Sequence, residues 1–511
     1  MLSESKMKIL KSTHIITCTI LMLFTSCRVA RFSPDKKYPV SAVLQDIDAT
    51  ESALLSYHPS LYWYADSLKV AEAFRRGRAA VKDSLTEPEF RNVLNEIVAV
   101  LRCGHTSVRH STKYTRYLSW KPPSGFPLGV KITDDSTLII VTNVNRNDSL
   151  LSRGDKILSI NNRSSKALID SLFPLVPGDG YVKTFSHQMI SNNFSRFYNS
   201  RFYKDSLYHI RFADSSGHLR EVVRKYYNRF ADSASWTMSF KSAKKIAPPN
   251  KLIRKEMLRS FLIDTAAQTA YLKINTFSSE IKKSYIKKQF RKLRDQHIPH
   301  LILDLRNNGG GLVSHSLLMA RLIHNKKFRY VDSIVSPSRK IKRPDDAMGR
   351  ITKRFWINIA MKLLHQRQKD GLYGFKIFAG KTYKPHRLNY MGKVYILTGG
   401  ASFSATSMLL ASVKGLPNVQ LIGEETGGGQ YGNNGIFIPD LVLPNTRLRL
   451  RIPLYRIINN HALPDNGRGV MPDIEIKADA ESIRRNKDVK MIKAEALIRA
   501  YKTSASPSIN P

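Results

Sequence analysis

The chain has few cysteines, and their positions argue against a disulfide framework. Only three occur among 511 residues: Cys18, Cys27 and Cys103. The first two lie in or just after an apolar N-terminal stretch, which leaves Cys103 without a partner in the rest of the chain. Neither C-x-x-C nor H-E-x-x-H spacing is present. We therefore expect neither a disulfide nor a metal site.

Acidic residues are scarce relative to basic ones. Lys and Arg together number 82 against 40 Asp and Glu, which gives a formal net charge of +42. Such a balance predicts attraction to polyanions, whether nucleic acid, anionic lipid or acidic envelope polymers. The basic residues are spread along the chain, however, and no zinc-finger spacing, RNP-like aromatic motif or heptad-linked basic region accompanies them. We expect no specific nucleic-acid binding, and a solvated basic surface would explain the same composition.

Long apolar runs are also missing. The run near the N-terminus, Ile15–Phe24, has about ten residues, about half of what a membrane-spanning helix needs. Three lysines precede it and LFTSC follows, so residues 1–27 fit a secretory signal. LFTSC resembles a loose bacterial lipobox, in which Cys27 would become the lipidated first residue. We therefore expect export to a bacterial cell envelope and a lipid anchor facing the periplasm. An ordinary signal peptide cut nearby, or an uncleaved anchor, is the alternative.

The rest of the chain divides by its hydrophobic periodicity. We expect a polar tether at 28–39, a helical region at 40–119 that ends in the GHT segment, a β-rich domain at 120–228, an α/β core at 250–480, and a C-terminal helix with a polar tail at 481–511. Within the core, residues 327–390 form a basic insertion. Residues 351–369 of that insertion predict an amphipathic helix that either packs on the core or lies on a membrane surface.

The β-rich domain contains the runs FPLGVKI, STLIIVTNV and DKILSINNRS, separated by turn residues. Their order resembles a PDZ domain of the type found in bacterial envelope proteases. The resemblance implies that backbone N–H groups around Leu128, Gly129 and Val130 receive a peptide's terminal carboxylate while the peptide pairs at the sheet edge. A generic β-sandwich fragment is the alternative.

Two glycine-rich turns follow apolar strands in the second half of the chain: DLRNNGGG at 304–311 and TGGASFS at 398–404. Neither G-x-x-x-x-G-K-[ST] nor G-x-G-x-x-G occurs in them, so we expect no nucleotide and no cofactor. Two such turns can bring free backbone N–H groups beside one hydroxyl, which is the composition of an oxyanion hole for acyl transfer. Taken alone, the second turn is equally typical of a helix N-cap.

DLRNNGGG, a G-x-S-F-S-A turn about a hundred residues later and IGEETGG together resemble the C-terminal-processing serine peptidases. That family includes the tail-specific proteases and the catalytic core of tricorn protease. The resemblance covers about residues 85–480 and implies an α/β, crotonase-like (ββα-type) core. It implies Ser404 as the nucleophile at the start of a helix, where the dipole favours negative charge. It also implies that the N–H groups of Ala405 and Gly310 are the oxyanion donors.

The identity of the base separates two branches of this family. Tail-specific proteases carry a lysine after GE-x-T, whereas Gly429 stands there in this sequence, and no Lys or Arg occurs from 416 through 445. The tricorn-like branch uses a histidine instead, and the GHTSV segment supplies His105 at the matching place. An imidazole with a pKa near 6.5 can accept the serine proton at neutral pH. His461 and His315 are the alternatives.

Two supporting groups of that branch are less clearly matched. A serine precedes the histidine there, whereas Gly104 does here, so a supporting hydroxyl is missing or comes from Thr106. The carboxylate that orients the imidazole precedes a G-V-x-P-D run in the family, and Asp465 is the acidic residue nearest to that place. We expect Asp473 to be a structural turn residue.

These features together predict an exported serine-type endopeptidase that acts on peptides or unfolded proteins and recognises C-termini through its PDZ-like domain. The alternative is a catalytically inactive envelope protein that binds peptides or polyanions. The sequence does not indicate an oligomeric state.

Overall fold

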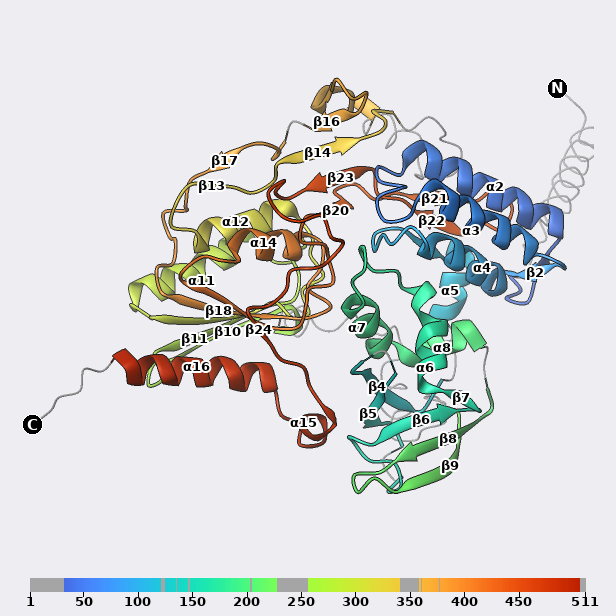
Figure 1. The fold of residues 1–511 in the computed structure, drawn as a ribbon, viewed down its shortest axis with the longest axis horizontal. Helices are drawn as coiled ribbons and strands as arrows, with labels where there is room; N and C mark the ends of the chain where they lie inside the picture. The colour runs from blue at the N-terminus through green and yellow to red at the C-terminus, as the bar shows by residue number, and fades with distance from the viewer. Residues whose placement is uncertain are drawn as a thin grey trace, which may run out of the picture.

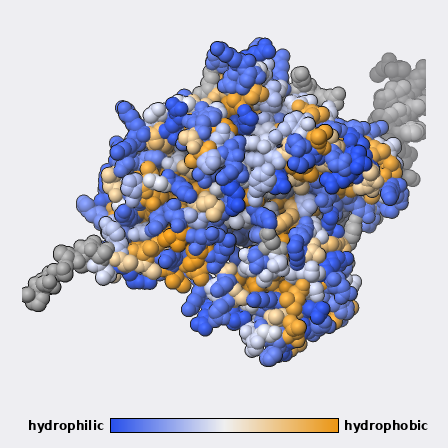
Figure 2. Space-filling view, viewed as in Figure 1, coloured by the Kyte–Doolittle hydropathy of each residue, from blue (hydrophilic) through white to orange (hydrophobic). Residues whose placement is uncertain are grey.

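The computed structural model describes residues 32–505, apart from 121–124, 135, 146–147, 203–204, 228–255, 341–357, 360 and 376. The predicted signal and its Cys27 lie outside these residues. No helix within the described ranges is long and apolar enough to cross a membrane. Hydrophilic side chains cover most of the face seen in Figure 2, and hydrophobic ones gather in smaller patches.

The core is built on a six-stranded sheet. Its order is β10 (Arg259–Asp264), β11 (Thr269–Ile274), β12 (His300–Asp304), β18 (Lys393–Thr398), β19 (Val419–Gly423) and β24 (Ile474–Glu475). All neighbouring strands run parallel except the first pair. β12 is buried along its whole length, as expected for a parallel strand covered on both faces.

Helices cover both faces of this sheet (Figure 1). α11 (Lys283–Asp295), α12 (Val313–Ile323) and α14 (Ala405–Val413) share a core with Leu301 and Leu303 of β12. α16 (Val489–Ala505) packs with Ile302 of the same strand on the other face, and the short α15 (Ala480–Arg484) precedes it. This alternation follows from the two-residue period of a strand. The carboxyl ends of β12 and β18 lead into the two glycine-rich turns, so both turns lie at one edge of the sheet.

The N-terminal region consists of α2 (Val40–Tyr57), α3 (Ser67–Ala79) and α4 (Glu87–Ala99), with the short pair β1 (Lys37–Tyr38) and β2 (Leu85–Thr86). α4 begins with a capping box between Thr86 and Glu89. The chain then turns through Gly104 and enters β3 (Ser107–Arg109) and α5 (Thr112–Trp120). β3 pairs with β22 (Arg449–Arg451), which pairs with β21 (Asp440–Val442). This pairing joins the GHT segment to the catalytic half of the chain.

The β-rich region forms a unit with its own hydrophobic core. Its strands are β4 (Leu128–Ile132), β5 (Leu138–Asn143), β6 (Lys156–Ile160), β7 (Arg163–Ser164), β8 (Leu207–Ala213) and β9 (Leu219–Lys225), and its helices are α6 (Ser165–Leu172), η1 (Phe173–Leu175), α7 (Thr184–Asn192) and α8 (Phe194–Phe202). β4 is an edge strand of the antiparallel sheet, and α7 packs against it. We call this part the β4–β9 unit.

The core contains a second sheet, and one of its strands lies where the sequence predicted part of a helix. It contains β15 (His365–Arg367), β16 (Tyr373–Phe375), β14 (Ser333–Ser336), β23 (Tyr455–Ile458) and β20 (Gly432–Gly435), and beside it β13 (Phe328–Arg329) pairs with β17 (Thr382–Tyr383). The continuous helix predicted over 351–369 is wrong, because His365–Arg367 pair with β16 as a strand. Residues 351–357 lie outside the described part. Pairing with a neighbouring strand outweighs a helical pattern in so short a segment.

Candidate active site

Ser404 lies in the turn between β18 and α14, at the N-cap of the helix. Its backbone has φ +56° and ψ −123°. This conformation is rare for a residue with a side chain, so the backbone is strained here and the surrounding packing must maintain it. The Ser402 hydroxyl contributes, because it donates to Leu305 O at 2.8 Å and ties the turn to the end of β12. The Ser404 side chain is therefore held at a fixed place beside the first turn of α14.

The neighbouring hydroxyls have structural positions. Ser407 donates to Ser402 O at 3.1 Å, and Thr406 is fully buried. Ser404 differs from these, because it lines a cavity of about 550 Å³ at this edge of the sheet.

His105 faces Ser404. Its Nε2 lies 3.1 Å from Ser404 Oγ, within hydrogen-bond distance, and its ring stacks on Phe403 at 4.6 Å between centroids. The side chain is almost completely buried. Burial, followed by the positive charge of Arg451, lowers the pKa of His105 to about 3. The imidazole is therefore neutral at physiological pH, the state in which it can accept a proton from Ser404.

The alternative histidines are placed elsewhere. His461 is exposed, and its Nδ1 lies 3.1 Å from Asp332 Oδ2. His315 is buried within α12, where its Nδ1 lies 3.4 Å from Ser314 Oγ. The hydroxyl of Thr106 contacts His58 Nε2 at 3.0 Å and so does not support His105.

The prediction for Asp465 is wrong. Its carboxylate accepts a hydrogen bond from Trp63 Nε1 at 2.8 Å at an exposed position. Among the described residues, the acidic side chain that comes within 4.0 Å of His105 is Asp179, whose Oδ1 lies at that distance from His105 Nδ1. The loop that follows β23 carries Asp465 away from the imidazole, whereas the segment between η1 and α7 brings Asp179 to it.

Asp179 is buried and its pKa is raised to about 7, because desolvation outweighs hydrogen bonds from the backbone N–H groups of Gly104 and Gly429. The Gly104 bond measures 2.8 Å. Asp179 Oδ2 and His105 Nδ1 are both buried without a hydrogen-bond partner among the described residues. A gap of 4.0 Å is too long for a hydrogen bond, but a shift of about 1 Å would close it, and such contacts often tighten only with substrate bound.

Sequence reasoning missed Asp179 because it lies 75 residues from Gly104 and inside the region assigned to peptide binding. The local signal was the PGDG segment, in which glycines flank an acidic residue. Gly180 has φ +59°, and an added Cβ there would come within 2.4 Å of Gly467 O. The segment therefore fits closely against the core. Gly429, at the place of the lysine in tail-specific proteases, supplies one of the N–H groups that hold Asp179.

The two predicted oxyanion donors differ in their environment. Ala405 N–H makes no hydrogen bond within the described part of the chain, and it directly follows the strained Ser404. The prediction for Gly310 needs correction, because its N–H donates to Asn308 Oδ1 at 2.9 Å. Gly309 and Gly311 of the same turn line the cavity. Gly310 instead provides space, since an added Cβ would lie 2.9 Å from both Ala405 N and Ser404 Cβ.

Gly310→Ala is expected to reduce activity more than the addition of a single methyl group suggests. Gly310 has φ +89°, and its new methyl group would push on the backbone of the nucleophile turn. We expect kcat to fall by about 100-fold or more, since a misplacement of about 1 Å has this effect, with a stability loss of about 1–3 kcal/mol. Steady-state kinetics and thermal unfolding would measure both. Gly371→Ala is the control for backbone strain alone, because Gly371 also has positive φ but open space around it. Equal loss of activity in both variants would contradict this role of Gly310.

Several other residues lie outside the contacts described so far. Asp304 and Arg306 form an ion pair at 2.8 Å behind the 304–311 turn, and Asp473 accepts from Leu421 N, both structural contacts. Leu128, Gly129 and Val130 lie in the edge strand β4, and the first two line a different cavity. Within the described residues, no lysine lines the Ser404 cavity, and no group of three or more His, Cys, Asp or Glu could hold a metal ion.

This arrangement supports nucleophilic catalysis. The Ser404 hydroxyl, on a strained backbone at a helix N-terminus, faces the neutral buried imidazole of His105. The buried carboxylate of Asp179 lies behind that imidazole. The N–H of Ala405, which has no hydrogen-bond partner among the described residues, follows the hydroxyl. These are the parts that acyl transfer by a serine hydrolase requires.

Part of the chain matches a known protein family. Residues 268–476, which contain the Ser404 turn, match the model of peptidase family S41. A comparison of the sequence with curated proteins finds no match. Solved structures with a similar fold include mature CPAF complexed with lactacystin, with a TM-score of 0.62, 14% identity, and coverage of 90% of this chain and 98% of that one. A CPAF mutant gives a TM-score of 0.64, 14% identity, and coverage of 92% and 99%.

The photosystem II D1 C-terminal processing protease matches with a TM-score of 0.41 at 15% identity, over 86% of this chain and 94% of that one. The fold is a mixed α/β fold similar to that of S41 enzymes, and the predicted serine hydrolase class is confirmed. The match over residues 268–476 is to a family of serine-type peptidases, which is the class predicted for this chain.

Proposed function

We propose that the chain hydrolyses peptide bonds of protein substrates with Ser404 as nucleophile, His105 as general base and Asp179 as the group that positions the imidazole. The observation that carries this proposal is the 3.1 Å approach of His105 Nε2 to Ser404 Oγ. No other histidine in the described ranges contacts that hydroxyl.

The reaction follows from these positions. Ser404 Oγ attacks the carbonyl carbon of the substrate while His105 Nε2 takes the hydroxyl proton. Negative charge on the carbonyl oxygen is stabilised by Ala405 N–H and by an N–H of the 309–311 turn. The imidazolium returns its proton to the leaving amine, which departs and leaves an acyl-enzyme. Water, deprotonated by the same imidazole, then releases the acyl group and restores Ser404.

Labelling with a fluorophosphonate probe tests this function. The wild-type protein is expected to react, because the probe needs only an activated serine, and His105→Ala is expected to lower the labelling rate by at least about 1,000-fold. His461→Ala is the matched control and should label at the wild-type rate. A folded wild type that stays unlabelled would indicate the alternative of a catalytically inactive binding protein. Labelling that is lost in His461→Ala but kept in His105→Ala would reassign the base.

We also infer that substrates are presented by the β4–β9 unit acting as a PDZ-like domain, and that the core is of the crotonase-like type. The edge position of β4 beside α7 supports the first point, because a peptide can add to a free strand edge. Repeated strand–turn–helix units at β12 and β18 support the second.

Export and lipid anchoring rest on residues 1–27 alone, with their lysines, short apolar run and LFTSC segment. Incorporation of labelled palmitate in bacterial cells tests this proposal. Loss of incorporation in Cys27→Ala, with retention in Cys18→Ala, is the expected result, and equal incorporation in both would contradict it.

A further inference from the structure

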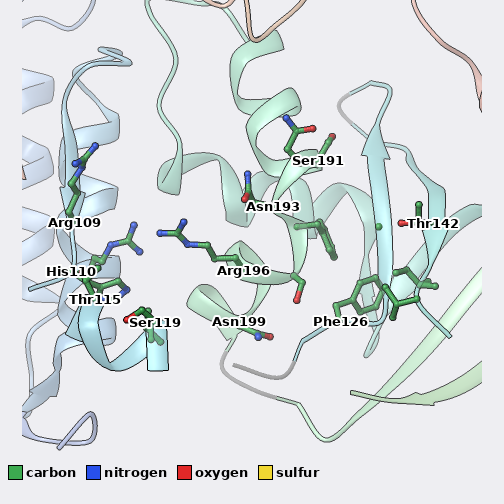
Figure 3. A pocket seen from close by; sticks show the side chains of 18 of the residues that line it. Arg109, His110, Thr115, Ser119, Phe126, Thr142, Ser191, Asn193, Arg196 and Asn199 are labelled. Atoms are coloured by element: carbon green, nitrogen blue, oxygen red, sulfur yellow. The ribbon is translucent and has the colours of Figure 1, made fainter. Parts of the chain in front are cut away.

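A second cavity lies between the N-terminal region and the β4–β9 unit (Figure 3). Its volume is about 820 Å³. One wall is formed by β3 and α5, and the other by the edge strand β4 and the segment from the end of α7 through α8. The basic side chains that line it are Arg91, Arg109, His110, Arg196 and Arg449.

Two of these arginines form no ion pair with an acidic side chain among the described residues. Arg91 is 9% exposed, and its guanidinium donates only to neutral groups, Val108 O at 2.9 Å and Ser200 Oγ at 3.0 Å. Arg196 is exposed on α8 and extends across the cavity toward the N-terminal region in Figure 3. It makes no hydrogen bond or ion pair in the described part of the chain. Each charge also disfavours the other, which contributes to a lowered pKa of Arg91 after burial.

The few carboxylates nearby are already shared. Asp440 Oδ2 lies 3.3 Å from Arg449 and 3.9 Å from Arg109, and Arg451 approaches the other oxygen of Asp440 at 3.8 Å. Glu87 accepts hydrogen bonds from Ser111 N and Oγ, both at 2.7 Å. Glu87 partly offsets the charge of Arg91, whose pKa it raises, but four arginines line the cavity against these two carboxylates, so the cavity carries excess positive charge.

The cavity adjoins the active site. Arg109 lines both this cavity and the one that contains Ser404. Arg109 follows His105 by four positions, so their Cα atoms lie within about 14 Å of one another. An extended peptide of about four residues is therefore long enough to reach from the neighbourhood of His105 to Arg109. Leu128 and Gly129 of the edge strand supply a backbone that such a peptide can pair with.

We propose that this arginine-lined cavity binds an acidic segment of the peptide substrate, about four residues from the bond that is cut. The inference rests on the proposed peptidase function and adds a substrate preference for Glu and Asp. A peptide fits better than an anionic polysaccharide, because the same cavity offers a strand edge and shares Arg109 with the cavity that contains Ser404. Guanidinium groups are well matched to carboxylates, since they can donate two parallel hydrogen bonds.

Binding to the full chain carrying Ser404→Ala tests the proposal without any turnover. A fluorescent extended decapeptide with three consecutive Glu residues is compared by anisotropy with the same peptide carrying Gln. We expect the Glu peptide to bind at least about ten times more tightly at low ionic strength, and the ratio to shrink at high salt. Arg196→Gln is expected to reduce the ratio about threefold or more, and Arg109→Gln combined with Arg196→Gln to abolish it.

Arg291→Gln is the matched control, because Arg291 is an exposed arginine on α11, far from the cavity, without an ion pair among the described residues. It should keep the full preference. Equal affinity for the two peptides would overturn the inference, as would a preference that survives in the double variant. Heparin and the unlabelled Glu peptide are compared as competitors of the fluorescent Glu peptide. If heparin displaces it at the lower concentration, the inference is overturned in favour of a site for polyanions. A Glu preference in a protein that the fluorophosphonate fails to label would instead overturn only the proposed catalysis.

Discussion

Ser404→Ala is expected to abolish both fluorophosphonate labelling and peptide hydrolysis, with a fall in kcat of about 10⁶-fold. Losses of this size are typical when the nucleophile of a serine hydrolase is removed, and combining Ser404→Ala with His105→Ala should add almost nothing because the two groups act as a unit. The alanine protein should fold normally, since Ser404 Oγ contacts only His105 among the described hydrogen bonds. Rates are measured by steady-state hydrolysis of a fluorogenic peptide.

Two further variants separate chemistry from backbone strain. Ser404→Gly is expected to be equally inactive but more stable than Ser404→Ala by about 1 kcal/mol, because glycine tolerates φ +56°. Ser412→Ala removes a hydroxyl from the same helix, where it donates to Leu409 O, and should retain activity. Substantial hydrolysis by Ser404→Ala would refute the assignment of the nucleophile.

Asp179→Asn is expected to lower kcat by about three to four orders of magnitude while leaving KM nearly unchanged. Asparagine keeps the shape of the side chain and can still accept from Gly104 N–H, but it cannot carry the negative charge that stabilises the imidazolium. Asp465→Asn is the matched control, because Asp465 lies against Trp63 on the surface, and its activity should stay within about twofold of wild type. If the two variants lost activity equally, the correction of the sequence-based assignment would be unsupported.

Asp179→Asn is also expected to change how the stability of the protein depends on pH. Asp179 has a pKa raised to about 7 in the folded protein, against an ordinary value near 4. The folded state therefore retains this proton when the unfolded state has lost it, and stability falls as pH rises from about 4 to about 7. Asp179→Asn should remove this loss and be more stable than wild type by a few kcal/mol above pH 7.

The activity of the wild-type protein is expected to change with pH in the opposite direction to its stability. The rate should rise as pH increases through about 7, because ionised Asp179 supports the imidazolium, and His105 is already neutral above about pH 3. In Asp179→Asn this rise of the rate near pH 7 should be absent. Thermal unfolding and kcat measured from pH 5 to pH 9 provide both tests. A step near pH 7 that persists in the variant would assign it to another group.

The sequence determined those parts of the site that depend on local structure. A strand followed by a small-residue turn and a helix places Ser404 at a helix N-terminus wherever the rest of the chain goes, and Ala405 N–H necessarily follows it. The GHT turn at the end of a helical region likewise presents His105. The segment RLRLRIPLYRI alternates between polar and apolar residues as extended chain does, and Pro453 divides it into β22 and β23, which lie in two different sheets.

Only the tertiary structure decided which groups meet these residues. Asp179 reaches His105 because the segment between η1 and α7 fits against Gly467, and no spacing in the sequence records that contact. Gly310 is adjacent to the nucleophile as expected, but the Asn308 side chain occupies its N–H. The arginine cavity arises where two parts of the chain with separate hydrophobic cores face each other. Periodicity and motifs describe the chain over a few residues, whereas burial, desolvation and the distances between charges depend on how distant segments pack.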